Sequence, residues 1–264
     1  YHRIRGSEIR MAGAQKAEGI ILRKYYLRET SYILVVFTRE FGKIKGVIKG
    51  VRKPYPQFAG NFEILTRCQL VFYRKKRGQM DLVTQCETLD FFLPVRRDIE
   101  RLTYANYLIE LIDMVTADHD ENEGIYHLLL ESISFLSGGA SPKRVSRIFE
   151  LKLLGAIGLS PQLDVCVKCA GELDRRAAFS APEGGMVCGG CIDPSAKAIR
   201  ISPGTVNFMR KVQKSEISRT SMIKVSRQVG RETERALRGF LDHHINRSPR
   251  SLVFLGQLEK AGIL

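Results

Sequence analysis

The stretch from residue 32 to residue 52, YILVVFTREFGKIKGVIKGVR, decides the fold of the first third of the chain. It contains two runs rich in Val, Ile, Phe, Tyr and Thr, residues 32–39 and 43–52, and the turn signal Glu40-Phe41-Gly42 separates them. β-Branched and aromatic runs bounded by turn residues predict strands. Three further runs have the same character, and they cover residues 17–23, 66–74 and 80–92.

Five short strands in about 80 residues fit a small barrel. The OB-fold is the five-stranded barrel that often binds single-stranded nucleic acid, and we expect it for residues 14–94. An SH3-like barrel would give a similar pattern, so periodicity leaves both open. Residues 1–10 carry charge but no apolar core, which argues against a signal peptide. Residues 1–13 are expected to be a flexible leader, with Met11 as a candidate native start.

After Pro94 the pattern changes to helical spacing, beginning with residues 98–116. Asp120, with Glu123 three residues later, predicts the cap of a second helix, and Ser141-Pro142 predicts the start of a third. Further helices are expected over residues 202–214 and 224–246. The chain is therefore predicted to be α+β. The barrel is followed by a helical domain (residues 95–160), a cysteine-bearing insert (161–198) and a C-terminal helical part (199–264).

Four cysteines in two pairs mark the insert. Cys166-x2-Cys169 is followed, 18 residues on, by Cys188-x2-Cys191. Two such pairs can place four thiolates around one tetrahedral zinc ion. Because the protein supplies all four ligands, such a site contributes folding free energy and leaves no position for a reactive water. An iron–sulfur cluster and a pair of disulfides are the alternatives, and a cytosolic compartment disfavours disulfides.

The charge of the chain is segregated along the sequence. The net charge is +14, and residues 1–98 contain 20 Lys/Arg against 9 Asp/Glu. Residues 99–141 contain 1 against 8, and residues 199–264 contain 13 against 5. A chain with two basic ends and an acidic middle is expected to bind a polyanionic partner. Alternatively, folding mixes these charges into an ordinary surface.

The basic residues of the predicted barrel are candidates for a nucleic-acid surface, because a row of cations can follow a phosphate backbone. They are Arg39, Lys43, Lys45, Lys49, Arg52, Lys53, Arg74, Lys75, Lys76 and Arg77. On a regular strand, Lys43, Lys45 and Lys49 would share one face. Aromatic side chains could stack on bases or simply fill the barrel core. The candidates are Tyr25, Tyr26, Tyr55, Phe58 and Tyr73.

No catalytic constellation is supported by spacing, so we expect no enzyme activity. The chain has no Walker A loop and no GxGxxG motif. His243 and His244 point about 100° apart on a helix, which makes a poor metal site. The acidic residues 118–121 fit the start of a helix better than a metal site. Cys68 and Cys86 lie in predicted strands, where they are expected to be buried apolar residues.

In their order along the chain, these parts resemble the bacterial recombination mediator family RecO. The similarity covers residues 16 to about 245. The segments that carry it are Glu18-Gly19-Ile20-Ile21-Leu22, Glu29-Thr30-Ser31-Tyr32-Ile33-Leu34, Phe37-Thr38-Arg39-Glu40-Phe41-Gly42, Lys49-Gly50-Val51-Arg52-Lys53 and Phe149-Glu150-Leu151-Lys152-Leu153-Leu154 with Gly158. Residues 54–62 depart from the family pattern, which leaves the loop there open.

The resemblance implies a cytoplasmic, nucleoid-associated protein of DNA repair and recombination. Such proteins bind single- and double-stranded DNA, anneal complementary strands, engage the acidic tail of single-strand-binding protein (SSB) and, with RecR, help to load RecA. They have no membrane partner. In relatives the SSB tail docks on the helical domain, and the residues that match best here are Arg144, Arg147, Phe149 and Leu153. We expect Arg147 to supply the cation, although this group could instead be core.

Two other classes of function remain compatible with the sequence. A zinc-ribbon factor of transcription or translation that binds RNA or polymerase would also combine a barrel with a zinc module. A zinc-dependent nuclease or deaminase is disfavoured, because an all-cysteine site is closed and the H-x-E signature is missing.

Overall fold

The computed structural model describes residues 13–27, 29–51, 62–75, 79–193, 195, 197–220, 223–245 and 248–263. The expected leader apart from residue 13, together with Arg52, Lys53, Tyr55, Phe58, Lys76 and Arg77, lies outside the described residues. The chain forms two compact units. We call the unit that ends at residue 91 and includes residues 116–123 the barrel unit. The helical unit comprises residues 92–115 and those from 124 onward.

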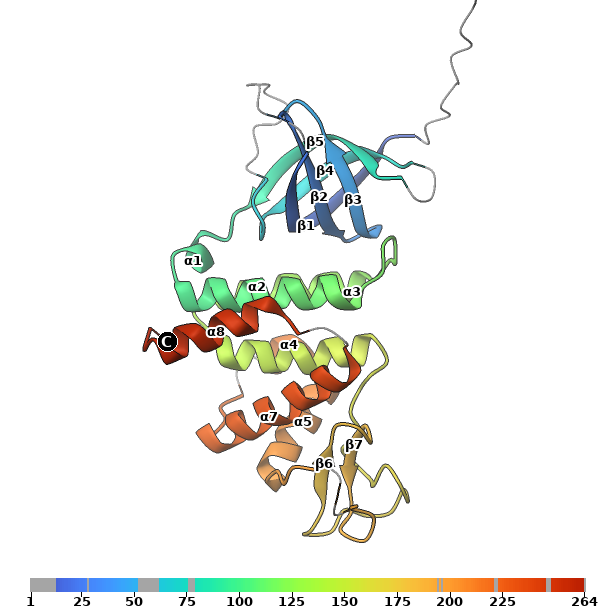
Figure 1. The fold of residues 1–264 in the computed structure, drawn as a ribbon, viewed down its shortest axis with the longest axis vertical. Helices are drawn as coiled ribbons and strands as arrows, with labels where there is room; N and C mark the ends of the chain where they lie inside the picture. Colours follow the sequence, from blue (N-terminus) through green and yellow to red (C-terminus); the bar gives the residue numbers. More distant parts are fainter. Residues whose placement is uncertain are drawn as a thin grey trace, which may run out of the picture. The chain divides into compact units, whose positions relative to one another are not determined.

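The barrel unit is a closed five-stranded barrel with strand order β1-β2-β3-β5-β4, in which β4 pairs back onto β1 (Figure 1). The strands are β1 (Gln15–Leu27), β2 (Ser31–Thr38), β3 (Gly42–Ile48), β4 (Arg67–Tyr73) and β5 (Asp81–Asp90). Strands β3 and β5 are parallel, and every other pair is antiparallel. The five predicted strands and the OB-like barrel are confirmed.

Alternate strand residues fill the interior of the barrel. Ile44, Leu70 and Phe72 are among the fully buried side chains of its core. Cys68 and Cys86 lie in the same cluster as unbridged thiols, which confirms their expected apolar role. The adjacent Cys86 thiol and burial raise the pKa of Cys68 well above its ordinary value, so this thiol stays neutral.

A segment from the acidic middle of the chain, residues 116–123, packs on the barrel. The His119 N–H donates to the carbonyl of Lys43 at 2.8 Å. Gly42 has φ +62°, and a Cβ there would lie 2.0 Å from the carbonyl oxygen of Asp120, so the approach requires glycine. The predicted cap is therefore wrong. The next helix begins at Glu123, and Asp120 lies against the barrel.

The helical unit is built around α4 (Pro142–Ala156), which contacts α2 (Ile99–Val115), α5 (Pro203–Lys214) and α7 (Arg227–His244). As predicted, α4 begins with Pro142 after the N-cap Ser141. The remaining helices are α1 (Leu93–Arg96), α3 (Glu123–Ser137), α6 (Ile217–Thr220) and α8 (Arg250–Lys260). None of the helices in the described part of the chain is long and apolar enough to span a membrane.

One hydrophobic core joins α4, α5 and α7 to the cysteine-bearing insert, which we call the cysteine module. Phe179 and Met186 of the module pack in the same cluster as Leu154 of α4, Met209 of α5 and Phe240 of α7. The module contains a two-stranded sheet of β6 (Ala178–Ser180) and β7 (Gly185–Val187) (Figure 1). The module is therefore continuous with the core of the helices that follow it.

Helix α8 was not predicted, because its cap comes from a distant part of the sequence. The N-cap residue Pro249 makes no side-chain cap hydrogen bond. Instead, the carboxylate of Glu110 in α2 accepts hydrogen bonds from the Arg250 N–H at 2.8 Å and from the N–H and hydroxyl of Ser251 at 3.0 and 2.7 Å. An acidic side chain at a helix N-terminus is stabilising.

Candidate metal centre and nucleic-acid surface

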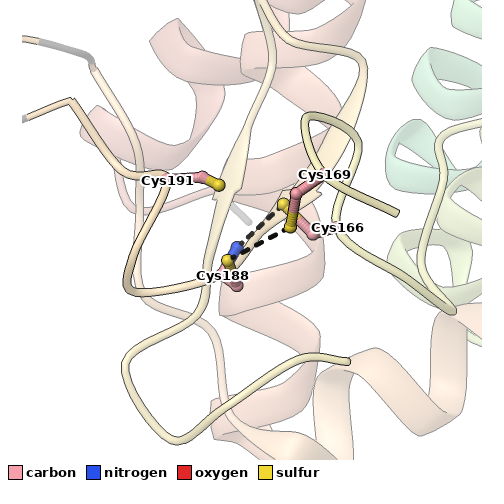
Figure 2. Close-up of side chains that lie close together, drawn as sticks. All are labelled: Cys166, Cys169, Cys188 and Cys191. Carbon is pink, nitrogen blue, oxygen red and sulfur yellow. Dashed lines mark hydrogen bonds between the residues drawn. The ribbon is translucent and has the colours of Figure 1, made fainter. Parts of the chain in front are cut away.

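The four cysteines of the module converge on one point. Figure 2 shows Cys166 and Cys169 meeting Cys188 and Cys191 from two separate loops. The four Sγ atoms all lie within 4.8 Å of one another, and those of Cys169 and Cys188 are 3.8 Å apart. This separation suits four sulfurs around one tetrahedral metal ion, since a Zn–S bond is about 2.3 Å long. The donor set therefore fits a metal ion.

Tight turns bring the sulfurs together. In the first knuckle, the Ala170 N–H donates to the Cys166 carbonyl and Ala170 takes a left-handed φ of 57°. In the second, the Cys191 N–H donates to the Cys188 carbonyl at 3.0 Å. The Cys188 N–H donates across to the Cys166 sulfur at 3.4 Å, so the backbone of one knuckle stabilises a thiolate of the other.

Hydrogen bonds shift the pKa values of two of the four thiols in opposite directions. Backbone N–H groups, first that of Cys188 and then that of Cys169, lower the pKa of Cys166 to about 6. Hydrogen bonds with the Cys188 and Cys169 side chains raise the pKa of Cys191 to about 12. The hydrogen bonds therefore favour the thiolate form of Cys166 and the thiol form of Cys191. A bound divalent metal ion would hold all four as thiolates.

Hydrogen bonds tie the first knuckle to its surroundings. The Gln162 N–H donates to the Gly184 carbonyl at 3.0 Å, and the Met186 N–H donates to the Gln162 carbonyl at 2.8 Å. A Cβ at Gly185 would lie 2.1 Å from the Gln162 carbonyl oxygen, so this contact depends on glycine. Arg210 of α5 donates from Nε to the Leu163 carbonyl at 3.0 Å. The cysteine cluster is therefore built on the helical core.

On the barrel, the predicted cations fall into different environments. Arg39, Lys45, Lys49 and Arg74 are exposed. Arg39 lies between two carboxylates, with its Nε 3.4 Å from Glu40 and 3.6 Å from Glu123. Lys45, Lys49 and Arg74 have no ion pair within the described residues. Lys75 is half-buried, and its backbone N–H donates to Asp81 at 3.0 Å.

Lys43 differs from the expectation of an open lysine stripe. It shares the outward face of β3 with Lys45, but it is only 8% exposed and its Nζ lies 4.0 Å from a carboxylate oxygen of Asp118. Residues 116–123, which pack against β3, account for this burial. Lys49 follows the last residue of β3, Ile48, so the regular pleat does not place it in line with the other two.

Exposed aromatic side chains lie where β1 and β2 pair near their connection. Tyr26 is 70% exposed, and its ring meets that of Tyr32 edge-on, with the centroids 5.3 Å apart. Tyr25 is 43% exposed and accepts a hydrogen bond from Arg23 at 3.1 Å. The ammonium of Lys24 lies 5.4 Å from the centroid of the Tyr32 ring. Tyr73, by contrast, is half-buried at the end of β4.

The candidate residues for SSB-tail binding lie mostly inside the helical unit. Arg147 is 4% exposed, and its two terminal nitrogens each lie 2.5 Å from a carboxylate, those of Glu150 and Glu234. Phe149 and Leu153 are buried as well. Arg147 therefore forms a buried ion pair in this structure and is not the exposed cation that the sequence suggested. The reason is that α4 contacts helices on several sides, which a sequence pattern cannot reveal.

Arg144, one turn earlier on α4, is half-buried. Its Nε atom is inaccessible to solvent and has no hydrogen-bond acceptor among the described residues. A buried N–H donor without an acceptor is unfavourable by about 1–3 kcal/mol. Of the four candidates, Arg144 is therefore the one with an unused donor.

The histidine pair lies at the C-terminal end of α7. The ring of His244 lies 4.3 Å from that of Phe240, and the rings of His243 and His244 are perpendicular. Within the part of the chain that the structure describes, the cysteines form the one group of three or more His, Cys, Asp or Glu residues that could hold a metal ion.

Comparison with known proteins agrees with both units. The family model for the N-terminal part of recombination protein O matches residues 11–92, and the model for its C-terminal part matches residues 96–252. The chain is 32% identical over 246 residues to the DNA repair protein RecO of Pelotomaculum thermopropionicum, covering 93% of this chain and 95% of that protein.

Two further relatives carry the same name. The RecO protein of Moorella thermoacetica is 32% identical over 250 residues, covering 94% of this chain and 92% of its own length. That of Halalkalibacterium halodurans is 30% identical over 247 residues, covering 94% and 96%. With a closed barrel, a helical unit and a four-thiol cluster in the order that the sequence predicted, the chain belongs to the RecO family of DNA repair proteins.

Proposed function

We propose that the protein binds single- and double-stranded DNA, anneals complementary strands and, together with RecR, helps to load RecA onto SSB-coated DNA. The observation that carries this proposal is the combination of exposed cations and exposed tyrosines on a closed five-stranded barrel. Lys45, Lys49 and Arg74 are unpaired among the described residues, and the side chains of Tyr25 and Tyr26 are exposed. This work would be carried out in the cytoplasm, in association with the nucleoid.

Annealing requires charge neutralisation and exposed bases but no covalent step. Each cation that replaces counterions on a strand adds to affinity in a salt-dependent way. Tyrosine faces can hold successive bases by stacking, worth about 1–3 kcal/mol per base, without reading their sequence. Two strands whose charge is screened and whose bases are unstacked from each other can then pair. Arg39 and Lys75, together with Arg52, Lys53, Lys76 and Arg77, complete the proposed surface, whereas Lys43 is covered by residues 116–123.

For the metal we propose one structural Zn²⁺ held by Cys166, Cys169, Cys188 and Cys191. Four thiolates in tetrahedral spacing suit zinc, and a site closed by protein ligands contributes to folding. Its role would be to hold the two knuckles together on the helical core. The proposed mechanism contains no hydrolytic step.

We also propose that the SSB tail docks on the helical unit beside α4. The candidate residues remain Arg144, Arg147, Phe149 and Leu153, but their roles differ. Arg144, the one member of the set that is only half-buried, would contact the acidic peptide through its guanidinium group. Arg147, Phe149 and Leu153 would support the site from within the core, since all three are buried. In a tail-peptide binding assay, Arg144→Ala should weaken affinity, and unchanged affinity would refute this assignment.

Strand annealing tests the main proposal. Complementary oligonucleotides coated with bacterial SSB are mixed with the full chain at two salt concentrations, without nucleotide. We expect annealing that high salt suppresses. The variant Lys45→Gln/Lys49→Gln/Arg74→Gln should bind DNA less tightly, with the slope of log affinity against log salt reduced by about 2 for a single strand.

A matched variant removes three positive charges from the helical unit. Arg175→Gln/Lys197→Gln/Lys260→Gln changes three exposed cations of the helical unit and should anneal like the unmodified protein. If the protein binds DNA but does not anneal coated strands, the annealing role is wrong, and binding to RNA and to polymerase becomes the next measurement.

A further inference from the structure

Helix α7 carries a row of exposed arginines that the barrel surface does not include. Arg227, Arg231 and Arg235 follow one another at intervals of four residues, and all three are exposed. At about 100° and 1.5 Å per residue, they fall within an arc of about 80° and span about 12 Å along the helix. We call these three residues the arginine stripe.

The stripe is not neutralised by its neighbours. None of its three arginines has an ion pair among the residues that the structure describes. The acids of the same helix are engaged elsewhere. Glu232 accepts hydrogen bonds from the hydroxyls of Ser202 and Thr205 at 2.7 and 2.6 Å, and Glu234 pairs with Arg147. Exposed Asp242, seven residues after Arg235, marks the C-terminal limit of the stripe.

The stripe does not help the helix to form. Arg227 is the first residue of α7, and the first turn contains no acidic residue. A cation there opposes the helix dipole by about 0.3–1 kcal/mol. Like charges four residues apart add a penalty of about 0.2–0.5 kcal/mol per pair. A charge pattern that is unfavourable within the protein indicates a partner outside it.

The surroundings of the stripe favour a nucleic-acid backbone over an acidic peptide. A DNA strand carries one phosphate per about 3.4 Å of helix axis, so about 12 Å faces three or four phosphates. The guanidinium fork matches a phosphate in two hydrogen bonds. A peptide would also need an apolar pocket beside the charge, but the large apolar residues of α7, Leu237, Phe240 and Leu241, are buried in the core.

We propose that the arginine stripe is a second nucleic-acid-binding surface, which holds a strand or duplex by its phosphates independently of base sequence. The proposal rests on the proposed function, because it assumes that the barrel unit binds the first strand. A molecule with two such surfaces holds two strands at once, and this raises the effective concentration of one strand near the other.

A bridging assay tests the proposal. A biotinylated oligonucleotide on beads captures the full chain, and a fluorescent second oligonucleotide of non-complementary sequence is then added, so that base pairing cannot retain it. We expect the unmodified protein to retain the second strand. Arg227→Gln/Arg231→Gln/Arg235→Gln should still bind the beads but lose most of the second strand. Its annealing rate should fall at least several-fold.

The other variants separate the possible outcomes. The barrel variant Lys45→Gln/Lys49→Gln/Arg74→Gln should also lose bridging, but through weaker binding of the first strand, and the matched variant Arg175→Gln/Lys197→Gln/Lys260→Gln should retain both strands. If the stripe variant bridges as well as the unmodified protein, the second surface is refuted while the proposed function stands. If the unmodified protein binds no DNA, the proposed function itself has failed. If the stripe variant loses binding to an acidic peptide but not bridging, the ligand is a protein.

Discussion

Helices α4 and α7 lie in the same unit and both carry arginines, yet the environments of these arginines are opposite. Arg147 of α4 is buried between Glu150 and Glu234, whereas Arg231 and Arg235 of α7 are exposed without a partner among the described residues. Burial lowers the pKa of Arg147, but the two carboxylates outweigh it and the net shift is upward, so this charge is permanent. An arginine within the fold therefore requires paired acids, whereas an arginine on the surface is available to a partner.

The largest expected effect comes from removing the proposed metal ion, because α4 and α7 share their core with the cysteine module. Chelation, or Cys188→Ser, should release the knuckles and loosen both helices, since structural zinc contributes binding free energy on the order of 10 kcal/mol in small modules. We expect the thermal midpoint to fall by on the order of 10 °C. Calorimetry with metal analysis measures this. Low pH should act in the same direction, because protons compete with the metal for the thiolates.

The matched control for the metal is Cys86→Ala, which removes a buried thiol of the barrel unit that is no part of the cluster. It should leave the metal content unchanged. If Cys188→Ser kept both its metal and its thermal midpoint, the cluster would not be structural.

Arg147→Ala should have the next largest effect. It leaves Glu150, which is fully buried, without its cation, and breaking a buried pair costs about 3–5 kcal/mol. Urea unfolding monitored by circular dichroism gives the free energy of unfolding. Arg144→Ala on the same helix serves as the comparison and should cost less than 1 kcal/mol, as is usual away from buried pairs. Equal losses for the two variants would contradict the difference between core and surface arginines.

Glu232→Gln tests the hydrogen bonds that Glu232 of α7 accepts from Ser202 and Thr205 at the start of α5. Burial disfavours its charge, but hydrogen bonds from Thr205, Ser202 and Gln228 outweigh burial and lower the pKa of Glu232 from 4.5 to about 2. A lowered carboxylate pKa stabilises the fold above pH 4.5, and this stability is lost as the pH falls from about 4.5 to about 2. We expect a loss of about 1–2 kcal/mol at pH 7. The variant should lose less stability than the unmodified protein across that pH range, as urea unfolding at several pH values would reveal.

The smallest effect on stability is expected for the arginine stripe. Arg227→Gln/Arg231→Gln/Arg235→Gln removes repulsion and a cation at the helix N-terminus, so the free energy of unfolding should stay the same or rise by about 0.5–1 kcal/mol. Urea unfolding beside the bridging assay measures both properties of one variant. A clear loss of stability would mean that the stripe supports the fold, which would end its contrast with Arg147.

Local features of the sequence were enough to place much of the fold. The five strands follow from β-branched runs and turn residues, and the start of α4 follows from Ser141-Pro142, because these signals act within a few residues. The two cysteine pairs predicted the cluster, because four thiolates at that spacing have few other uses. Helix α8 was not predicted from the sequence, because the side chain that caps it, Glu110, lies 140 residues before Arg250.

The local elements and the spacing of the thiols follow from the amino-acid sequence, because each depends on near neighbours along the chain. Which charges are accessible to a partner depends on the folded chain. The tertiary structure covered Lys43 with residues 116–123, enclosed Arg147 beside two carboxylates and left the arginine stripe open. The physical reason is that the cost of burying a charge depends on what surrounds it in space, and those partners come from distant parts of the chain.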